Sequence, residues 1–568
     1  MSDGVDPVTL AVLRNGFEAV AEEMNAALVR TGYSPNITER RDCSTALFDA
    51  AGRMVAQAET MPVHLGAMPF SVAAATEAFP PAELEPGDAV LLNDPFRGGA
   101  HLPDLTLVTP VYAENELLGF AANRAHHADI GGATAGSVGA NSTEIYQEGL
   151  RIPPVKFIEG GDVNRDLLDT ILANVRTPDE RRGDLRAQEA ANETGRNRLR
   201  ELVSEHGADT VREAFTEVQE YAERRMREEI AALPDGEYAF EDVIEDDGRG
   251  NEDLPVAATV RIDGKDVVVD FAGTADQTAG PVNAVRAVTV SATYFALRAV
   301  TDPSIPPNEG CYRPITVETP ESSLVNPDPP AAVVGGNLET SQRVTDVVLG
   351  ALANAVPERV PAAGQGTMNN VTIGGTDPRD GEPYALYETQ AGGFGGRAGG
   401  DGMDAVHVHM SNTRNTAVEV LETAYPLRVR RYALRPDSGG AGEFRGGLGL
   451  RRDIELRGDA TVSLLAERHR TRPYGLAGGE DGASGAAFVD GEPVPAKTTL
   501  DCAAGTLVSV RTPGGGGFGA PEERTPEAVL RDLRLGKITV EEASRYGVDP
   551  SDTEVASDPD DDSTDSGA

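Results

Sequence analysis

The chain has 568 residues, which is too long for one ordinary hydrophobic core and predicts several packed units. With 39% hydrophobic residues it has ample material for cores, so intrinsic disorder is excluded except at the ends. Acidic residues outnumber basic ones by 92 to 50, and the net charge of −42 repels phosphates and anionic lipid head groups, which excludes a nucleic-acid-binding protein.

Only four of the 50 basic residues are lysines, and the remaining 46 are arginines. An acidic excess with so few lysines is typical of a halophilic, haloarchaeon-like protein, because at about 1 M salt the Debye length is roughly 3 Å and carboxylates hardly repel one another. The alternative is an acidic interaction protein. It is disfavoured because the acidity is spread from Asp3 to Asp565 instead of forming one patch.

The sequence predicts a cytoplasmic protein with no membrane partner. No stretch approaches the roughly 18 continuous apolar residues of a membrane span, and the N-terminus lacks the basic and apolar regions of a signal peptide. The three cysteines, Cys43, Cys311 and Cys502, lie far apart without a CxxC motif. Neither a disulfide framework nor a cysteine-based zinc site is therefore expected.

A long amphipathic helix is predicted from Pro7, because apolar residues recur at helical spacing as far as Leu28. From Asp88 onward, short apolar runs separated by turn residues predict strands. Residues 164–232 return to helical spacing. They predict two charge-rich helices separated near Gly207.

Strands and helices alternate in blocks through the rest of the chain. After a turn at residues 234–236, three strand-like runs follow, and Asp263-Gly264 predicts a hairpin between the last two. A helix-rich stretch precedes glycine-rich β structure from about 366 to 520, and Glu522 to Tyr546 predicts a closing helical pair. The acidic tail beyond has too little apolar surface to fold.

Together these elements predict a mixed α and β (α+β), multi-domain fold with antiparallel or mixed sheets and packed helices. We expect six segments. They are an N-terminal α+β unit with a metal-binding hairpin (1–160), a helical segment (161–235), a mixed β/α unit (236–365), a glycine-rich β unit (366–520), a C-terminal helical pair (521–547) and a disordered acidic tail (548–568).

Three of the eight histidines, His101, His126 and His127, fall within 27 positions. His101 and Asp104 precede one predicted strand, and His126 and His127 follow the next. If the two strands form a hairpin centred near residues 114–115, paired positions sum to about 229. That register places Asp104 opposite about residue 125 and His101 opposite about 128, so these groups converge at the open end.

Two imidazoles and a carboxylate on adjacent strand ends suit a divalent Zn, Mn or Fe ion, with positions left open for water or substrate. The metal ligands predicted in this way are His101, Asp104 and His126. His127 and Asp129 are alternative ligands, or they orient a ligand without binding the metal themselves. The other interpretation is that all these residues are polar groups that hydrogen-bond loop carbonyls at a strand end.

A second candidate region spans residues 37–68 and contains Glu39, Asp42, Cys43 and His64. His64 is a candidate general acid or base, and Glu39 and Asp42 are candidate substrate-binding residues. Cys43 would need a base and a lowered thiol pKa to act as a nucleophile. The alternative interpretation is that Cys43 is a small buried residue with no chemical role. The alternative for His64 is a structural role, in which it only hydrogen-bonds polar groups of its own loop.

His407 and His409 alternate along a predicted strand and so share one face, where either is a candidate for a further metal or substrate contact or a solvated surface residue. The glycine run 514–517 is not a phosphate loop, because no GxxxxGK[ST] motif occurs. The glycine-rich pieces at 392–400 and 439–450 are expected to serve tight turns and close backbone contacts.

A series of motifs in chain order resembles the hydantoinase B family over about residues 6–548. The motifs are HLPDLTLVTPVY, GFAANRAHHADIGG, EIYQEGLRIPPVKF, NVRTPDERRGDLRAQEAA, VDFAGTADQTAGPVNA, MSNTRNTAVEVLE, DSGGAGEFRGGLGLRRD and VRTPGGGGFGAPEERTPEAV. That family includes N-methylhydantoinase B subunits, the C-terminal half of 5-oxoprolinase and the acetone carboxylase α subunit. Its acetone carboxylase branch implies a metal held by an HxxD pair and a later histidine, which match His101, Asp104 and His126.

The resemblance implies the B subunit of an ATP-dependent cyclic amide hydrolase of the hydantoinase, N-methylhydantoinase or 5-oxoprolinase type. A separate hydantoinase A-like subunit would use the ATP, in a hetero-oligomer that opens a small cyclic amide with the help of the metal. One alternative is a subunit of an ATP-dependent carboxylase of the acetone or acetophenone type. Another is a non-catalytic scaffold for the A subunit.

Overall fold

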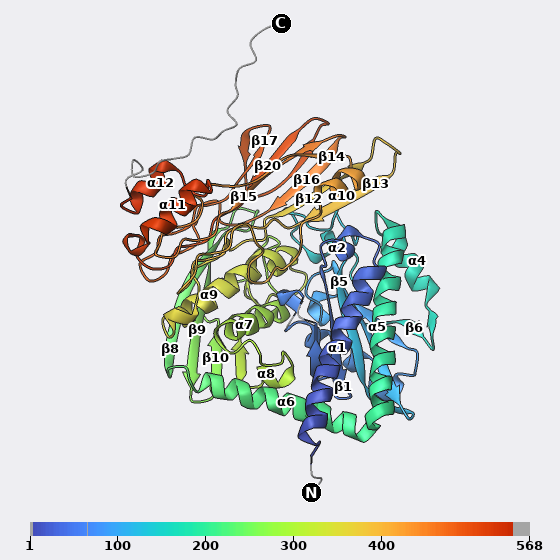
Figure 1. Cartoon of the computed structure of the whole chain (residues 1–568). Helices are drawn as coiled ribbons and strands as arrows, with labels where there is room; N and C mark the ends of the chain where they lie inside the picture. The colour runs from blue at the N-terminus through green and yellow to red at the C-terminus, as the bar shows by residue number, and fades with distance from the viewer. Residues whose placement is uncertain (1–3, 59, 65, 549–568) are drawn as a thin grey trace.

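The computed structural model describes residues 4–58, 60–64 and 66–548, and it contains four β-sheets with helices packed between and outside them (Figure 1). The predicted mixed α and β fold is confirmed. The division into six segments stays a prediction, and the predicted acidic tail, apart from Val548, lies outside the described residues. Among the residues described, no helix is both long and apolar enough to span a membrane.

A seven-stranded sheet forms the N-terminal part, in the order β2-β1-β5-β4-β3-β6-β7. Its strands are β1 (Cys43–Asp49), β2 (Met54–Gln57), β3 (Ala89–Leu92), β4 (Asp104–Ala113), β5 (Glu116–His126), β6 (Val155–Glu159) and β7 (Asp162–Val163). Helix α1 (Pro7–Thr31) buries its apolar stripe, as predicted, against this sheet and against α5 and α6. The short helices α2 (Pro35–Thr38) and α3 (Met68–Ala78) complete this part.

The β4–β5 hairpin is antiparallel, and its register is shifted by one residue from the prediction. Asp104 pairs with His126 and not with residue 125, because a β-bulge between Val111 and Tyr112 inserts one extra residue. His101 was expected opposite residue 128. It lies instead in the turn that precedes β4, outside the ladder.

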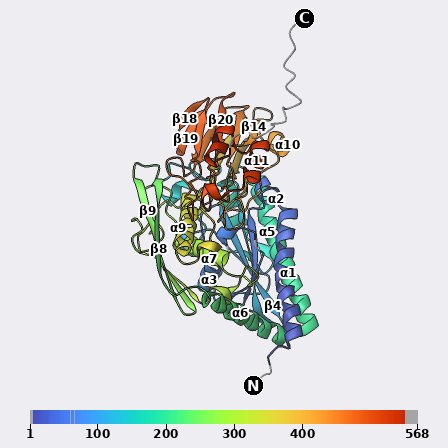
Figure 2. The same cartoon turned by 60° about the vertical axis from the view of Figure 1, so that its left-hand side comes forward.

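Three helices follow: α4 (Arg165–Ala173), α5 (Pro178–His206) and α6 (Ala208–Ile230). The predicted break at Gly207 is confirmed, since this residue adopts a left-handed φ of 85° that an L side chain would resist. Helix α4 is an additional short helix that the prediction did not separate. Helices α1 and α5 run side by side on the outer face of the N-terminal sheet (Figures 1 and 2).

The second sheet has the order β11-β10-β9-β8 and is formed by β8 (Gly236–Asp246), β9 (Glu252–Asp263), β10 (Asp266–Asp270) and β11 (Ile315–Glu318). The predicted hairpin at Asp263-Gly264 is confirmed, with Asp263 paired to Asp266. Between this sheet and the N-terminal one lie α7 (Arg286–Val300) and α9 (Ser341–Ala353) (Figure 2), and α8 (Glu309–Tyr312) lies below them in Figure 1. Every residue of α9 is buried.

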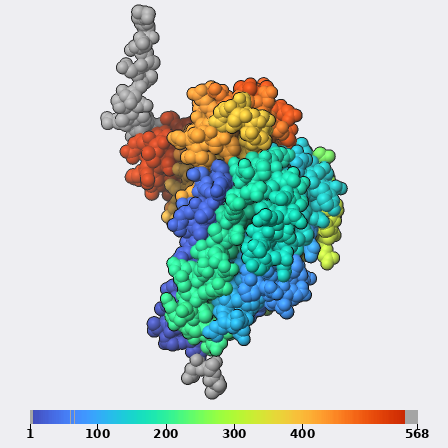
Figure 3. All heavy atoms as spheres, turned by 90° about the vertical axis from the view of Figure 1, so that its right-hand side faces the viewer, coloured from blue at the N-terminus to red at the C-terminus, as the bar shows by residue number. Residues whose placement is uncertain are grey.

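The C-terminal part contains two sheets that share one core. One is formed by β12 (Asn370–Thr376), β13 (Pro383–Glu388), β16 (Ala460–Leu465) and β19 (Lys497–Cys502). The other is formed by β14 (Leu427–Leu434), β15 (Leu450–Leu456), β17 (Ala486–Val489), β18 (Glu492–Val494) and β20 (Leu507–Arg511). Helix α10 (Val418–Ala424) and the predicted closing pair, α11 (Pro526–Arg534) and α12 (Val540–Arg545), flank them. This part caps one end of the molecule (Figure 3).

The glycine run 514–517 packs against other backbone, as expected. A Cβ atom on Gly514 would lie 1.7 Å from the carbonyl oxygen of Ser438, and one on Gly515 would lie 2.1 Å from that of Phe394. Only glycine fits at such distances. The glycine run therefore allows close backbone packing against the segments near residues 392–400 and 438–450.

Candidate metal centre

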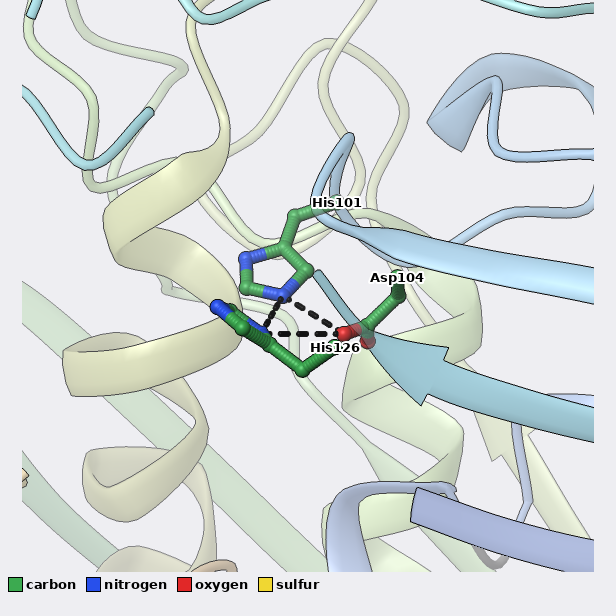
Figure 4. A group of neighbouring side chains, drawn as sticks. All are labelled: His101, Asp104 and His126. Carbon is green, nitrogen blue, oxygen red and sulfur yellow. Dashed lines mark hydrogen bonds and ion pairs between the residues drawn. The ribbon is translucent and has the colours of Figure 1, made fainter. Parts of the chain in front are cut away.

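The side chains of His101, Asp104 and His126 meet in the interior of the N-terminal part (Figure 4). Asp104 is the first residue of β4 and His126 is the last of β5, so the hairpin pairing sets them face to face. The turn before β4 brings His101 back over this end. All three are buried, with at most 2% of the residue exposed.

The three ligand atoms form a tight triangle. Asp104 Oδ1 lies 2.9 Å from His101 Nε2 and 3.2 Å from His126 Nδ1, and the two ring nitrogens are 3.2 Å apart. If both ring nitrogens carry a proton and donate it to Asp104 Oδ1, the two N–H groups crowd each other, because the nitrogens are only 3.2 Å apart. A cation resolves that conflict, and two ligands at right angles about 2.1 Å from one ion are about 3 Å apart. The residues present fit a divalent metal ion.

The electrostatics of the triangle also fit a cation. Burial by itself raises the pKa of the Asp104 carboxyl, but His101, His64 and hydrogen bonds from the ring nitrogens outweigh burial and hold this pKa well below its ordinary value. Burial lowers the pKa of His126, and the hydrogen bond to Asp104 offsets only part of this shift. An anionic carboxylate and a neutral imidazole are the protonation states that ligate metals.

His64 lies beside the triangle, on the short helical turn Pro62–His64. Its Nε2 is 3.3 Å from Asp104 Oδ2, and its Nδ1 is 2.9 Å from the hydroxyl of Ser44 on β1. Both ring nitrogens therefore have polar neighbours. His64 thus lies between Ser44 on β1 and the second carboxylate oxygen of Asp104, which places the predicted acid–base residue next to the predicted ligands.

A small cavity of about 10 Å³ adjoins the triangle, which is room for about one water molecule. Asp42, His64, Asp104 and His126 form part of its wall. Distant parts of the chain complete it, including Asn337, Tyr387, Thr389, Ser411 and Thr413. The Tyr387 ring stacks on the His126 ring at a centroid distance of 4.7 Å, which fixes the orientation of the imidazole.

A larger cavity of about 380 Å³, called the outer cavity below, lies next to the small one, and Met61 and Ser411 belong to both walls. Apolar side chains such as Phe295 and Phe394 line it together with polar ones such as His409. Its volume and mixed lining are those of a site for a small organic ligand.

His127 and Asp129, predicted as alternative ligands, point to other partners. His127 Nε2 contacts Gln188 Oε1 on α5 at 3.0 Å, and burial, with a contribution from Arg181, lowers the pKa of this histidine to about 4. Asp129 pairs with Arg176 at 2.9 Å and accepts hydrogen bonds from the backbone of Gly131 and Gly136. Asp129 thus orders the loop after β5.

The remaining predicted residues divide between the site and the scaffold. Asp42 lies on the wall of the small cavity, whereas Glu39 on the same turn is half-buried and lines neither cavity. Cys43 is fully buried in β1, and burial strongly raises the pKa of its thiol, which matches the buried-residue interpretation.

The strand predicted for His407 and His409 is wrong. The segment forms only an isolated bridge at Val406, and His409 adopts a left-handed φ of 51° in a turn. Both histidines nevertheless line the outer cavity. The sequence analysis missed Asn337, Tyr387, Thr389, Ser411 and Thr413, and only the motif MSNTRNT pointed near two of them.

Comparison with known proteins gives consistent similarities. The family model described as Hydantoinase B/oxoprolinase matches residues 6–521. The chain is 42% identical over 547 residues to an uncharacterized protein of Methanocaldococcus jannaschii, covering 95% of each chain. It is 36% identical to the putative B subunit of a D-/L-hydantoinase from a Pseudomonas species, covering 97% of this chain and 96% of the relative. The crystal structure of the ATP-dependent caprolactamase from Pseudomonas jessenii matches with a TM-score of 0.90 and 33% identity, covering 96% of each chain.

Proposed function

This chain belongs to the hydantoinase B/oxoprolinase family, and from that premise we propose that it is the B subunit of an ATP-dependent cyclic amide hydrolase. The observation that carries the proposal is the buried triangle of His101, Asp104 and His126 beside a ligand-sized cavity. A divalent Zn, Mn or Fe ion held there would supply Lewis-acid polarisation of a carbonyl and activation of water.

The residues around the triangle would hold and orient the reactants. Asp104 contributes a negative charge in a region closed to bulk water, where electrostatic interactions are strong. A hydrogen bond with Ser44 holds the ring of His64 beside Asp104, and Tyr387 stacks on the ring of His126. The outer cavity would take the body of the cyclic amide, with the scissile bond toward Met61 and Ser411, where the two cavities adjoin.

ATP use would reside in a separate A subunit. The chain has no GxxxxGK[ST] motif, and an unstrained cyclic amide needs activation before water attacks it. One similar protein is named as the B subunit of a hydantoinase, and the similar caprolactamase is ATP-dependent. The first name supports a partner subunit, and the second supports the use of ATP.

The decisive experiment is co-purification with the A partner in molar KCl, followed by ring-opening assays with and without ATP. Suitable substrates are hydantoin, N-methylhydantoin, 5-oxoproline and caprolactam. ATP-dependent opening of one of them, together with stoichiometric metal in the chain, is the expected result. A complex that contains no bound metal and opens none of these rings would contradict the proposal and favour a scaffold role.

A further inference from the structure

His409 lies on the wall of the outer cavity and faces a buried carboxylate. Its Nε2 is 3.2 Å from Asp346 Oδ1, within ion-pair distance, and both side chains are at least 98% buried. Asp346 is in the middle of the fully buried helix α9, so this neighbour cannot move away. The contact lacks hydrogen-bond geometry, but at this distance the buried carboxylate attracts any positive charge on the imidazole.

The buried charge of Asp346 is compensated on its other side. Asp346 Oδ2 lies 2.9 Å from Arg468 Nη2 and 3.6 Å from Arg343 Nη1. Both guanidinium groups are themselves buried. Because the arginines contact Oδ2, Oδ1 is left to face the histidine.

The ring of His409 is held in place at an energetic cost. The backbone of His409 is left-handed, with a φ of 51°, which is unfavourable for a side chain with a Cβ. Phe295 and Phe394 approach the ring edge-on, with centroid distances of 6.1 and 5.8 Å. Because Nε2 is the ring nitrogen next to Asp346, Nδ1 is the one that remains for the cavity.

His407, two residues away, has a different environment. Its Nδ1 is 2.9 Å from Ser411 Oγ and its Nε2 is 3.2 Å from Thr413 Oγ1, so hydroxyl groups occupy both nitrogens. Burial, with a smaller contribution from Arg40, lowers its pKa to about 3. Of the two histidines that line the outer cavity, His409 is therefore the one with a ring nitrogen for a ligand.

We propose that His409, positioned by Asp346, is the residue that protonates the leaving nitrogen of the cyclic amide. The inference rests on the proposed function. As the C–N bond breaks, its electron pair stays on nitrogen and takes the proton from Nδ1 of the imidazolium. The ring is left neutral and regains a proton from water in the cavity. The charged or titratable groups around it are Asp346, His407 and Arg298, which also line the cavity or contact the ring.

The test variant is His409→Gly in the complex with the A partner, because glycine suits the left-handed φ and the fold should be retained. His206→Gln, far along the chain at the end of α5, is the control. We expect kcat for ring opening to fall by about 100-fold or more, with little change in KM. Added imidazole should restore part of kcat. An unchanged kcat, or a loss confined to KM, would overturn the inference.

A second measurement is independent of turnover. In histidine labelled with ¹⁵N, the neutral His409 ring should carry its proton on Nε2, toward Asp346, with the signal assigned by its loss in His409→Gly. A proton on Nδ1 would overturn the dyad even if the enzyme is active. If the wild-type complex opens none of the amides but the proton is on Nε2, the proposed function fails and the Asp346–His409 pair stands.

Discussion

Asp104 and His126 occupy directly opposed positions at the end of the β4–β5 hairpin, and their side chains meet with Oδ1 and Nδ1 3.2 Å apart. The pairing of the backbone thus sets the spacing of two proposed ligands before any other element is added. His101 then needs only the tight turn before β4 to close the triangle. The three proposed ligands therefore come from one short stretch of the sequence, residues 101–126.

The first prediction concerns metal binding. His126→Ala removes one of three proposed ligands, so bound metal should fall from about one ion per chain to a small fraction, and ring opening should fall with it. Elemental analysis of the purified protein measures this directly. His206→Ala is the matched control, because that histidine lies at the end of α5 and should leave metal content unchanged. Full occupancy in His126→Ala would refute the site.

The extent to which the sequence predicts this site follows from its geometry. His101, Asp104 and His126 lie at the open end of one hairpin, so the expected antiparallel pairing of its two strands was enough to bring them together. Nothing in the sequence indicates the bulge between Val111 and Tyr112, and this bulge shifts the pairing of β4 with β5 by one residue from the prediction. Tyr387 on β13 and Ser411 at the end of a turn reach the site from distant parts of the chain, where tertiary packing and not local pattern decides their position.

The second prediction concerns salt. With a net charge of −42, repulsion between carboxylates grows as the Debye length lengthens from roughly 3 Å at 1 M to roughly 10 Å at 0.1 M. The melting temperature should therefore rise steadily from 0.1 M to 3 M KCl. Scanning calorimetry across that range checks it. An identical melting temperature at both ends would show that the acidic surface is not a salt adaptation.

The third prediction concerns pH. Burial raises the pKa of Glu148 to about 8, and its Oε1 accepts hydrogen bonds from the backbone of Val333 and Val334. The folded state binds this proton more tightly than the unfolded chain. The resulting stability is therefore complete below about pH 4.5 and is lost as the pH rises through about 8.

Glu148→Gln keeps the acceptor and removes the titration. Relative to this variant, the wild type should lose up to about 1.4 kcal/mol of unfolding free energy per pH unit between pH 5 and 8. Denaturant unfolding of both proteins at constant molar salt gives the difference. Parallel curves for the two proteins would mean that Glu148 does not bind a proton in the folded state.

The fourth prediction concerns the glycine-rich loops. Gly514→Ala would place a Cβ 1.7 Å from the carbonyl oxygen of Ser438, so backbone must shift and the variant should lose at least about 2 kcal/mol. In Gly16→Ala the new Cβ would meet Leu202 at an ordinary 3.4 Å, within a helix, so this control should be neutral or stabilising. Equal stability of the two variants, measured by denaturant unfolding, would contradict the packing argument.

The fifth prediction concerns the partner. The isolated chain should neither hydrolyse ATP nor open a hydantoin or 5-oxoproline ring at a significant rate, whereas the pair should do both. Molar salt screens charge, so the contact with the A subunit should be large and apolar. Truncation after Val548 removes a segment rich in acidic residues and poor in apolar ones. The truncated chain should therefore still co-elute with its partner in size-exclusion chromatography.

Ring-opening assays of the separate and combined subunits decide whether activation and hydrolysis are divided between two chains. Ring opening should require ATP, because the cyclic amide is unstrained and phosphorylation of its oxygen by the partner makes water attack favourable. The control is the pair with His126→Ala, in which ATP hydrolysis by the partner can persist while ring opening is lost. Ring opening by the isolated chain without ATP, abolished by His126→Ala, would show that this subunit hydrolyses the amide alone and that the partner is dispensable.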